Sequence, residues 1–264
     1  MITSVHNPRL QAVRRLQANA KERREQQAFI VDGVRLAEEA WQAGWHAQQV
    51  FFTDQLDSRG KAVVEGFISM NVPVEEVSQA VMQAICETET PQGILVVLAQ
   101  RSLPLPAKPD FLLIVDGLRD PGNLGTLLRT AAAAGAQGVL LAPGCADAWS
   151  GKVLRAGMGA HFRLPIHALS WPAIRGILKG ETGALKIYLA DPAAGVLFTK
   201  MDFQAPLALI VGGEAAGAGS EALALAEAKV RIPMPGGSES LNAAVAASIL
   251  MFEVVRQRGK EKGA

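Results

Sequence analysis

The sequence predicts an α/β protein with two domains, a smaller N-terminal one and a larger C-terminal one built on a parallel sheet. Its 264 residues are enough for two ordinary domains. Three prolines within residues 101–110 indicate an extended linker, because proline fixes φ and donates no hydrogen bond. After this linker, apolar strand-like runs alternate with helix-like segments, a pattern typical of a parallel sheet with helices on both faces. We therefore divide the chain into residues 1–105 and 106–264.

Residues 1–105 show a small α/β pattern of their own, which opens with a basic helix over roughly residues 8–26. The elements expected after this helix are strands at 28–32, 50–53 and 94–99, and helices at 35–43 and 58–70. Gly44 follows the helix at 35–43 and suits a helix C-cap. A segment of about 100 residues is long enough for an independent hydrophobic core.

Residues 106–264 show the longer alternation. Strands are expected at 111–116, 138–142, 163–168, 185–190, 207–212 and 229–234, and helices at 124–134, 150–157, 172–179, 221–228 and 241–257. The run at 111–116 is continuously apolar, as in a strand buried on both faces. The last helix places Leu241, Val245 and Phe252 along one side and is apolar on further sides as well. This is more apolar surface than one sheet face requires, so we expect a homodimer buried through the C-terminal domain.

Composition excludes several classes of protein. The chain is 49% hydrophobic with a formal net charge of +1, whereas disordered chains combine low hydrophobicity with high net charge. It has no run of eighteen apolar residues and no apolar signal segment, so we expect a soluble, cytoplasmic protein. Cys86 and Cys145 are far apart and have no second cysteine or histidine nearby, which argues against a zinc site, another metal centre or a disulfide framework.

Basic residues are concentrated near both ends of the chain. Residues 1–30 contain six basic side chains against two acidic ones, and residues 253–262 repeat this bias. Clustered bases of this kind neutralise phosphates, or they keep a surface helix solvated. The charges alone leave both interpretations open.

Glycine and polar residues collect in three segments, 116–129, 209–219 and 232–242, each at the end of an expected strand. Ligands of open α/β sheets bind at such strand ends. The segments lack the GxGxxG spacing of dinucleotide sites, and residues 212–220 contain no lysine for a P-loop. The four histidines fit no catalytic triad spacing. Nucleotide hydrolysis, zinc catalysis and triad hydrolysis are therefore unsupported.

Five polar side chains in these segments are candidates for chemistry: Asn123, Arg129, Glu214, Ser240 and Asn242. Arg129 and Ser240 each have a structural alternative. Arg129 lies in an otherwise apolar helix and would need an ion-pair partner if it were buried. Ser238 or Ser240 would serve equally well as the N-cap of the final helix.

The three segments together resemble the ordered motifs of the SpoU (TrmH-type) RNA 2′-O-ribose methyltransferases. The matching stretches are Asn-Leu-Gly-Thr-Leu-Leu-Arg at 123–129, Val-Gly-Gly-Glu-Ala-Ala-Gly at 211–217, and Ile-Pro-Met followed by Glu-Ser-Leu-Asn within 232–242. Residues 29–38 resemble that family's substrate-binding domain, which is similar to a ribosomal-protein fold of the L-thirty-e type. The resemblance covers nearly the whole chain, and three motifs in order are more specific than any one.

This resemblance implies an enzyme that methylates the ribose 2′-oxygen of RNA with S-adenosylmethionine. It also implies a homodimer and a deep trefoil knot in the C-terminal α/β domain. Because a separate N-terminal domain accompanies family members that act on ribosomal RNA, the resemblance favours ribosomal RNA as the substrate, with transfer RNA as the alternative. The N-terminal domain would bind that RNA, with contacts from Arg14, Arg15, Arg23 and Arg24.

The resemblance also assigns roles to the candidate residues. Arg129 would be the catalytic arginine, which holds a phosphate or stabilises the developing alkoxide, since a guanidinium is a poor base. Asn123 and Asn242 would orient Arg129 or the ribose, Ser240 would donate a hydrogen bond nearby, and Glu214 would fix Arg129 or a ribose hydroxyl. The residues expected to bind the cofactor are Gly212, Ile232, Met234 and Leu241.

One position departs from the family pattern, because Gly213 stands where the second motif usually has asparagine. This departure favours, as an alternative, a non-catalytic RNA-binding protein with the same fold. A nucleotide-dependent oxidoreductase is a further alternative, but the absence of the GxGxxG motif of dinucleotide sites argues against it.

Overall fold

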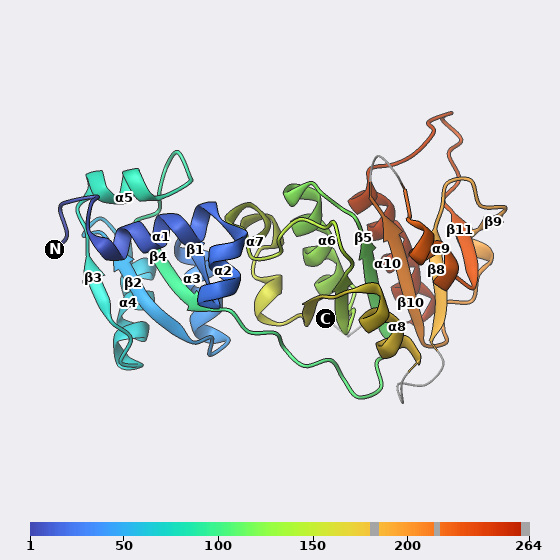
Figure 1. Cartoon of the computed structure of the whole chain (residues 1–264), viewed down its shortest axis with the longest axis horizontal. Coiled ribbons are helices and arrows are strands. Elements are labelled where there is room, and N and C mark those ends of the chain that lie inside the picture. Colours follow the sequence, from blue (N-terminus) through green and yellow to red (C-terminus); the bar gives the residue numbers. More distant parts are fainter. Residues whose placement is uncertain (180–184, 214–216, 260–264) are drawn as a thin grey trace. The chain divides into compact units, whose positions relative to one another are not determined.

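The computed structural model describes residues 1–179, 185–213 and 217–259, and Figure 1 labels its helices and strands. The chain forms two compact units. The first consists of Met1–Arg101 and Asp147–Phe162, and the second of Ser102–Ala146 and Arg163–Ala264. Residues 147–162 therefore belong with the N-terminal part of the chain, a grouping that a single division at residue 105 does not anticipate.

The first unit contains a four-stranded sheet of order β1-β4-β2-β3. Its strands are β1 (Ala28–Asp32), β2 (Ala47–Phe52), β3 (Val74–Glu76) and β4 (Ile94–Ala99). β4 is antiparallel to both β1 and β2, and β2 is parallel to β3. The helices are α1 (Pro8–Ala18), α2 (Ala20–Gln26), α3 (Val34–Gln42), α4 (Ser58–Ser69) and α5 (Gln79–Ile85). The short elements β3 and α5 were not predicted, whereas β1 and β4 have the expected bounds.

The predicted basic helix over residues 8–26 is two helices, so that prediction is wrong in this detail. The break is at Asn19, whose φ of −130° and ψ of 116° are extended. The Asn19 side chain accepts a hydrogen bond from the Lys21 backbone N–H at 2.8 Å and so begins α2. An asparagine that caps a new helix is therefore the physical reason for the break.

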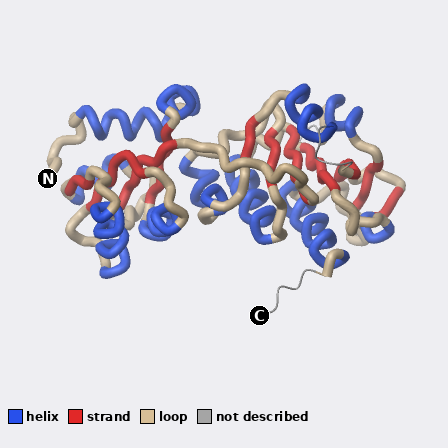
Figure 2. The backbone as a smooth tube through the Cα atoms, turned by 90° about the horizontal axis from the view of Figure 1, so that it is seen from below, coloured by secondary structure: helices blue, strands red, loops and turns tan. Residues whose placement is uncertain are grey.

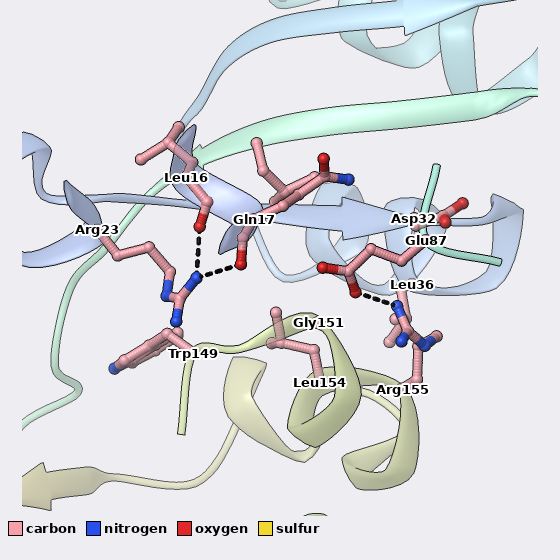
Figure 3. A pocket seen from close by; sticks show the side chains of 11 residues that line it. Leu16, Gln17, Arg23, Asp32, Leu36, Glu87, Trp149, Gly151, Leu154 and Arg155 are labelled. Atoms are coloured by element: carbon pink, nitrogen blue, oxygen red, sulfur yellow. Dashed lines mark hydrogen bonds and ion pairs between the residues drawn. The ribbon is translucent and has the colours of Figure 1, made fainter. Parts of the chain in front are cut away.

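Residues 147–162 contain α7 (Gly151–Gly157) and the 3-10 helix η1 (Ala160–Phe162). We expected the helix here to cover the parallel sheet, but α7 packs against β1 of the first unit instead. Figure 3 shows Leu154 and Trp149 of this segment beside Leu16 and Leu36. The Trp149 ring lies 4.7 Å from the ring of Phe29, measured between centroids. Aromatic packing thus ties the segment to the first unit.

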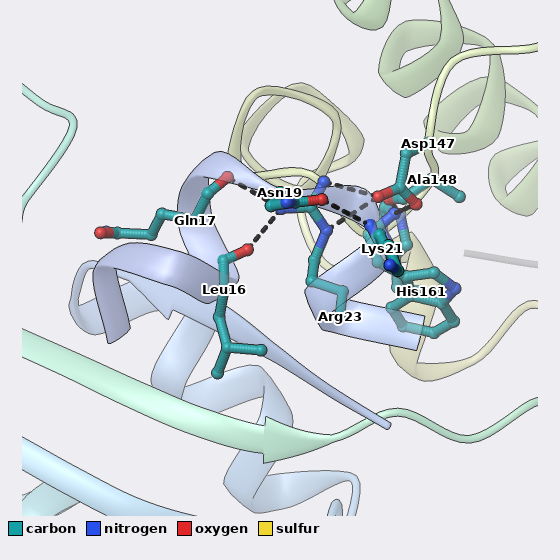
Figure 4. Close-up of polar contacts among 9 residues, drawn as sticks. Leu16, Gln17, Asn19, Lys21, Arg23, Asp147, Ala148 and His161 are labelled. Carbon is teal, nitrogen blue, oxygen red and sulfur yellow. Dashed lines mark hydrogen bonds and ion pairs between the residues drawn. The ribbon is translucent and has the colours of Figure 1, made fainter. Parts of the chain in front are cut away.

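Arg23 provides the polar part of this attachment (Figure 4). Its side chain is 5% exposed, and its Nε donates to Asp147 Oδ2 at 2.8 Å while Nη1 donates to the carbonyls of Leu16 and Gln17. These hydrogen bonds offset the cost of burying the guanidinium charge, whereas loss of its partner would leave that charge uncompensated. The Arg23–Asp147 pair therefore fixes the segment in the first unit.

The second unit contains a seven-stranded sheet of order β7-β6-β5-β10-β8-β11-β9, in which every adjacent pair is parallel. Its strands are β5 (Phe111–Asp116), β6 (Gly138–Leu141), β7 (Ile166–Ala168), β8 (Lys186–Ala190), β9 (Val196–Leu197), β10 (Leu207–Gly212) and β11 (Ala228–Arg231). Its helices are α6 (Pro121–Ala133), α8 (Trp171–Lys179), α9 (Ser220–Leu225), α10 (Ala243–Gln257) and the 3-10 helix η2 (Phe198–Lys200). The predicted parallel α/β sheet is confirmed.

Helices cover both faces of this sheet, as Figure 2 shows. On one face, Leu112 and Ile210 form an apolar cluster with Ile174 of α8 and Ala222 of α9. Alternate strand residues point to the other face, where α10 packs on β10 and on α6. β11 is shorter than expected, because Pro233 cannot donate a ladder hydrogen bond.

Within the described residues, no helix combines the length and the apolar character that a membrane span would require. The same part of the chain contains no group of three or more His, Cys, Asp or Glu side chains arranged to hold a metal ion.

Candidate active site

A cavity of about 230 Å³ lies at the carboxyl ends of β8, β10 and β11 and is closed on one side by α10. Three loops and one helix supply its walls: Ala190, Asp191, Pro192, Val211, Gly212, Gly213, Gly217, Val230, Ile232, Met234, Ser240, Leu241, Ala243, Ala246 and Leu250. This is where parallel α/β sheets bind their ligands, because adjacent loops diverge at the strand ends.

Glycine is required in the loop after β10 because backbone segments approach it closely. A Cβ on Gly212 would lie 2.4 Å from the carbonyl carbon of Gly217, and one on Gly213 would lie 2.5 Å from the oxygen of Gly117. The Asp116 carboxylate accepts a hydrogen bond from the Gly219 N–H at 2.7 Å, which joins the loop after β5 to the loop after β10. Gly213 therefore occupies a position in which an asparagine would collide with backbone.

The lining of the cavity is mostly apolar side chains and exposed glycine backbone. Ile232, Met234 and Leu241 provide the apolar surface on the β11 side. Asp191 is the one ionisable side chain among the described lining residues. Its carboxylate accepts from the Ala193 N–H at 2.9 Å and pairs with Lys229 Nζ at 3.2 Å. Such a lining suits a flat heteroaromatic ring together with a group that carries positive charge.

The structure brings five of the predicted site residues together. Gly212, Ile232, Met234 and Leu241, which we expected to bind the cofactor, and Ser240 all line the cavity. Ala190, Asp191 and Pro192 were missed by sequence reasoning. The signal that marks them is an Asp-Pro pair directly after the apolar run of β8, which is a turn at a strand end.

The remaining candidates lie elsewhere. Asn242 is the N-cap of α10, because its Oδ1 accepts from the N–H groups of Ala244 and Val245 at 2.9 and 3.2 Å. The expectation that Ser238 or Ser240 caps this helix is therefore wrong. Asn123 and Arg129 belong to α6 and are not among the lining residues, and Glu214 lies outside the described residues.

α6 presents Arg129 to solvent. The helix begins at Asp120, whose carboxylate accepts from the Asn123 N–H at 2.7 Å, and it buries Leu124, Leu127 and Leu128. Arg129 is exposed and forms no ion pair with any residue that the structure describes. Among those residues, the structural ion pair considered for Arg129 is thus not found, and its guanidinium is available to a ligand.

Nucleophilic chemistry by a cysteine is not supported at this end of the sheet. Cys145 donates a hydrogen bond to the Val115 carbonyl at 3.3 Å, and burial raises the pKa of its thiol. A thiol with a raised pKa stays neutral and unreactive.

The four arginines expected to contact RNA differ in availability. Arg24 is exposed and has no ion-pair partner in the described part of the chain, whereas Arg15 is exposed and pairs with Glu22 at 3.5 Å. Arg14 donates to the Ala84 carbonyl at 3.1 Å. The prediction for Arg23 is wrong, because this side chain is buried and held by Asp147.

Comparisons with known proteins agree with this geometry. Residues 110–252 match the SpoU rRNA methylase family, and residues 7–96 match the MRM3-like substrate-binding domain. The chain is 33% identical to the 23S rRNA (guanosine(2553)-2′-O)-methyltransferase RlmP of Bacillus subtilis, over 96% of this chain and 98% of that one. It is 34% identical to the human mitochondrial rRNA methyltransferase 3, over 96% of this chain and 73% of that one.

A solved structure is similar over the same length. The AdoMet-bound rRNA methyltransferase from Sinorhizobium meliloti superposes with a TM-score of 0.86 at 31% identity and covers 97% of both chains. The family match spans all the residues that line the cavity. The chain therefore belongs to the SpoU rRNA methylase family, as its motifs predicted.

Proposed function

We propose that this protein transfers a methyl group from S-adenosylmethionine to a ribose 2′-oxygen of ribosomal RNA. One observation carries the proposal: loops after three parallel strands and the start of α10 build one cavity from the residues expected to bind the cofactor. The relatives named above, an rRNA 2′-O-methyltransferase and an rRNA methyltransferase, support the reaction and the substrate class.

The cavity fits the cofactor chemically. Ile232, Met234 and Leu241 would flank the adenine, and the backbone around Gly212 would hydrogen-bond to it because no side chain blocks the approach. The Asp191 carboxylate would lie near positively charged groups of the methionyl part. When bound, S-adenosylmethionine supplies an electrophilic methyl group on a sulfonium. The chain's own residues must then position the ribose hydroxyl and manage its proton.

The side chains of this site are suited to positioning and electrostatic stabilisation. The described lining contains no histidine or cysteine that could serve as a general base. Arg129 would hold a phosphate of the RNA or stabilise the developing alkoxide, since guanidinium stays charged. Ser240 and the amide N–H₂ group of Asn242 would donate to the ribose or its phosphate, while Asn242 Oδ1 remains engaged in the helix cap. Glu214 and Asn123 are the two remaining residues that we propose take part in catalysis.

The proposal includes a homodimer formed through α10. Val245 and Phe252 on this helix are 47% and 50% exposed, which leaves apolar surface for a second copy to cover. It also includes the trefoil knot that the family resemblance implies, in which α10 passes through a loop to complete the cofactor cavity. Ala243, Ala246 and Leu250 of α10 line that cavity.

RNA binding is proposed for the first unit, through Arg14, Arg15 and Arg24. The match of residues 7–96 to a substrate-binding domain supports this division of labour. We also propose a cytoplasmic location. Cys86 and Cys145 are both free, as is usual where thiols are kept reduced, and cell fractionation would test this.

Methyl transfer from tritium-labelled S-adenosylmethionine to ribosomal or transfer RNA tests the proposal directly. We expect label in ribosomal RNA only, in dinucleotides that resist alkali, because a 2′-O-methyl group blocks cleavage at the neighbouring phosphate. Label in transfer RNA alone would contradict the substrate. If RNA binds but calorimetry detects no cofactor binding, the protein is the non-catalytic binder.

A further inference from the structure

The first unit contains a second cavity, of about 380 Å³, at the edge of its sheet where β1 and β2 end and β4 begins. The Gly33 N–H donates to the Ile94 carbonyl at 3.1 Å, and the Thr53 N–H donates to the Gly93 carbonyl at 2.9 Å. These bonds hold the three chain segments together. α3 and α4 both begin at this edge, so their N-terminal N–H groups face the same region. The volume lies within the range of about 300–1,000 Å³ that is usual for ligand pockets.

The packing of the first unit leaves the Thr53 hydroxyl without a hydrogen-bond partner. Its side chain is 1% exposed and lines the cavity, and its Oγ1 has no hydrogen-bond partner. A buried hydroxyl without a partner destabilises a fold, so such groups are rare unless a ligand satisfies them. A Cβ on Gly93 would lie 2.6 Å from Thr53 Oγ1, so only glycine lets this backbone pack so close to the hydroxyl.

The other polar lining side chains are three amides, two guanidinium groups and one carboxylate. Gln55, Gln79 and Gln92 contribute three amides. The Oε1 of Gln92 accepts from the Val34 N–H at 2.8 Å, and no hydrogen bond from its N–H₂ group to a described residue is found. Amides both donate and accept, and they match the hydrogen-bonding edges of nucleobases.

Charge at this cavity is mixed but favours an anion. Arg35 is exposed and pairs loosely with Glu39 at 3.5 Å, whereas Arg59 is held by Glu38. Asp57 is the single acidic lining residue, and its carboxylate is occupied as the N-cap of α4, where it accepts from the Gly60 N–H at 2.7 Å. Arg35 and the start of α3 therefore leave room for one phosphate.

We infer that this cavity receives a single unpaired nucleotide of the RNA substrate, with its base or ribose hydrogen-bonded to Thr53 and the glutamine amides and its phosphate beside Arg35. The inference rests on the proposed function, since it takes the substrate to be RNA. It adds a recognition site for an unstacked nucleotide in the first unit, separate from the cofactor cavity. A paired base could not bind here in the same way, because its Watson–Crick edge is already hydrogen-bonded to its partner base.

Nuclear magnetic resonance on the full-length protein tests the inference. The probes are a synthetic RNA hairpin with an unpaired loop, a fully paired RNA duplex of the same length, and the four nucleoside monophosphates. We expect the hairpin to shift the Thr53 methyl signal and the side-chain amide signals of Gln55, Gln79 and Gln92, and the duplex to leave them in place. Unchanged signals while the hairpin binds would overturn the inference. Shifts with free monophosphates but not with the hairpin would overturn it too, and would assign the cavity to a small nucleotide.

Substitutions provide the second test. Thr53→Val removes the hydroxyl at nearly constant shape, and Arg35→Gln removes the charge. We expect each to weaken hairpin binding at least fivefold, with an unchanged affinity for S-adenosylmethionine. Neither should lower the melting temperature, and Thr53→Val should raise it, because it removes a buried hydroxyl that has no partner. Lys61→Gln is the matched control, since Lys61 is exposed on α4 outside the lining. Wild-type hairpin affinity in both Thr53→Val and Arg35→Gln would contradict the inference. Loss of methyl transfer by the wild type, with hairpin shifts retained, would instead contradict the proposed function alone.

Discussion

Arg129 is a single charged side chain in a helix that is otherwise mostly apolar. A helix that buries leucines on one side can present a guanidinium on the other without cost, and Arg129 is exposed in this way. Its pattern in the sequence was compatible with an ion pair as well as with catalysis, and the structure shows no ion pair between Arg129 and a described residue. An exposed arginine beside a polar loop is free to bind phosphate.

We expect Arg129→Ala to lower methyl transfer by at least a hundredfold while the Kd of S-adenosylmethionine changes by less than about threefold. The reason is that Arg129 does not line the cofactor cavity but would act on the RNA or the developing alkoxide. Labelled methyl transfer and calorimetry measure the two quantities. Wild-type turnover in this variant would refute the role.

Arg23 and Arg24 are adjacent in the sequence and differ completely in environment. Arg24→Gln should reduce the slope of log K against log salt for RNA binding by roughly 0.7–0.9, because one phosphate contact is lost. Arg23→Gln should instead lower the melting temperature, because Asp147 loses its buried partner. Salt titrations and thermal unfolding of both variants test this, and a steep loss of stability in Arg24→Gln would be contrary to it.

His161 should make the protein sensitive to mild acid. Its side chain is buried, its Nε2 donates to the Ala148 carbonyl at 2.8 Å, and burial lowers its pKa to about 4. Between pH 6.5 and 4 the unfolded chain takes up a proton that the folded protein does not. The free energy of unfolding should therefore fall as the pH drops through this window, by up to about 3 kcal/mol.

The measurement is urea unfolding at pH 7 and pH 4.5. His161→Gln keeps a donor for Ala148 and should lose this part of the pH dependence. His6→Gln is the control, because His6 is exposed. Equal pH dependence in the wild type and His161→Gln would show that other groups cause the acid sensitivity.

At the level of elements, the sequence was informative where periodicity was strong and where a single residue marked an end. β1, β4, β5 and β10 were expected with their observed bounds, because their apolar runs are uninterrupted. β3 was missed, since its three residues Val74–Glu76 are only partly buried and two of them are acidic. α7 was expected as a helix but assigned to the wrong core, because periodicity shows which face of a helix is apolar and not what covers that face.

The candidate site was predictable to a similar extent. Two of the three cavity loops, those after β10 and β11, and the four cofactor residues follow from turn chemistry and from the family motifs. The Asp191–Pro192 turn was missed because β8 carries no motif, and the role of Asn242 as a cap became clear only from its two hydrogen bonds.

α10 carries the prediction that belongs to this scale. Val245→Asp combined with Phe252→Asp should convert the protein to a monomer in sedimentation experiments at micromolar concentration, because buried carboxylates would oppose association. Leu223→Asp on α9 is the control, since Leu223 is similarly exposed at 41% and should leave the dimer intact. A wild-type protein that sediments as a monomer would disprove the dimer.

For the whole molecule, deleting one continuous stretch of sequence cannot remove the first unit and leave the cofactor cavity intact. All described lining residues of the cavity belong to the second unit, so cofactor binding should not need residues 1–105. However, residues 147–162 bury Trp149, Leu154 and Phe162 within the first unit. A deletion of residues 1–105 alone would expose these side chains.

We therefore expect a protein that lacks residues 1–105, and in which a short glycine-serine linker replaces 147–162, to remain soluble and to bind S-adenosylmethionine within about threefold of the full chain. Its RNA affinity should fall. Deletion of residues 1–105 alone should cause aggregation, detectable by light scattering. Full RNA affinity in the protein with the linker would mean that the second unit recognises RNA by itself.

The attachment of residues 147–162 has a consequence for synthesis on the ribosome. The first unit cannot be completed when Arg101 emerges, because Asp147 must still arrive to neutralise Arg23 and Trp149 to cover Phe29. At about 5–20 residues per second, residues 102–162 take about 3–12 seconds to translate. During that interval Phe29 and Trp45 lack part of their packing, and the nascent chain depends on whatever shields them in the meantime. Any slowing of translation within residues 102–162 would prolong this exposed stage.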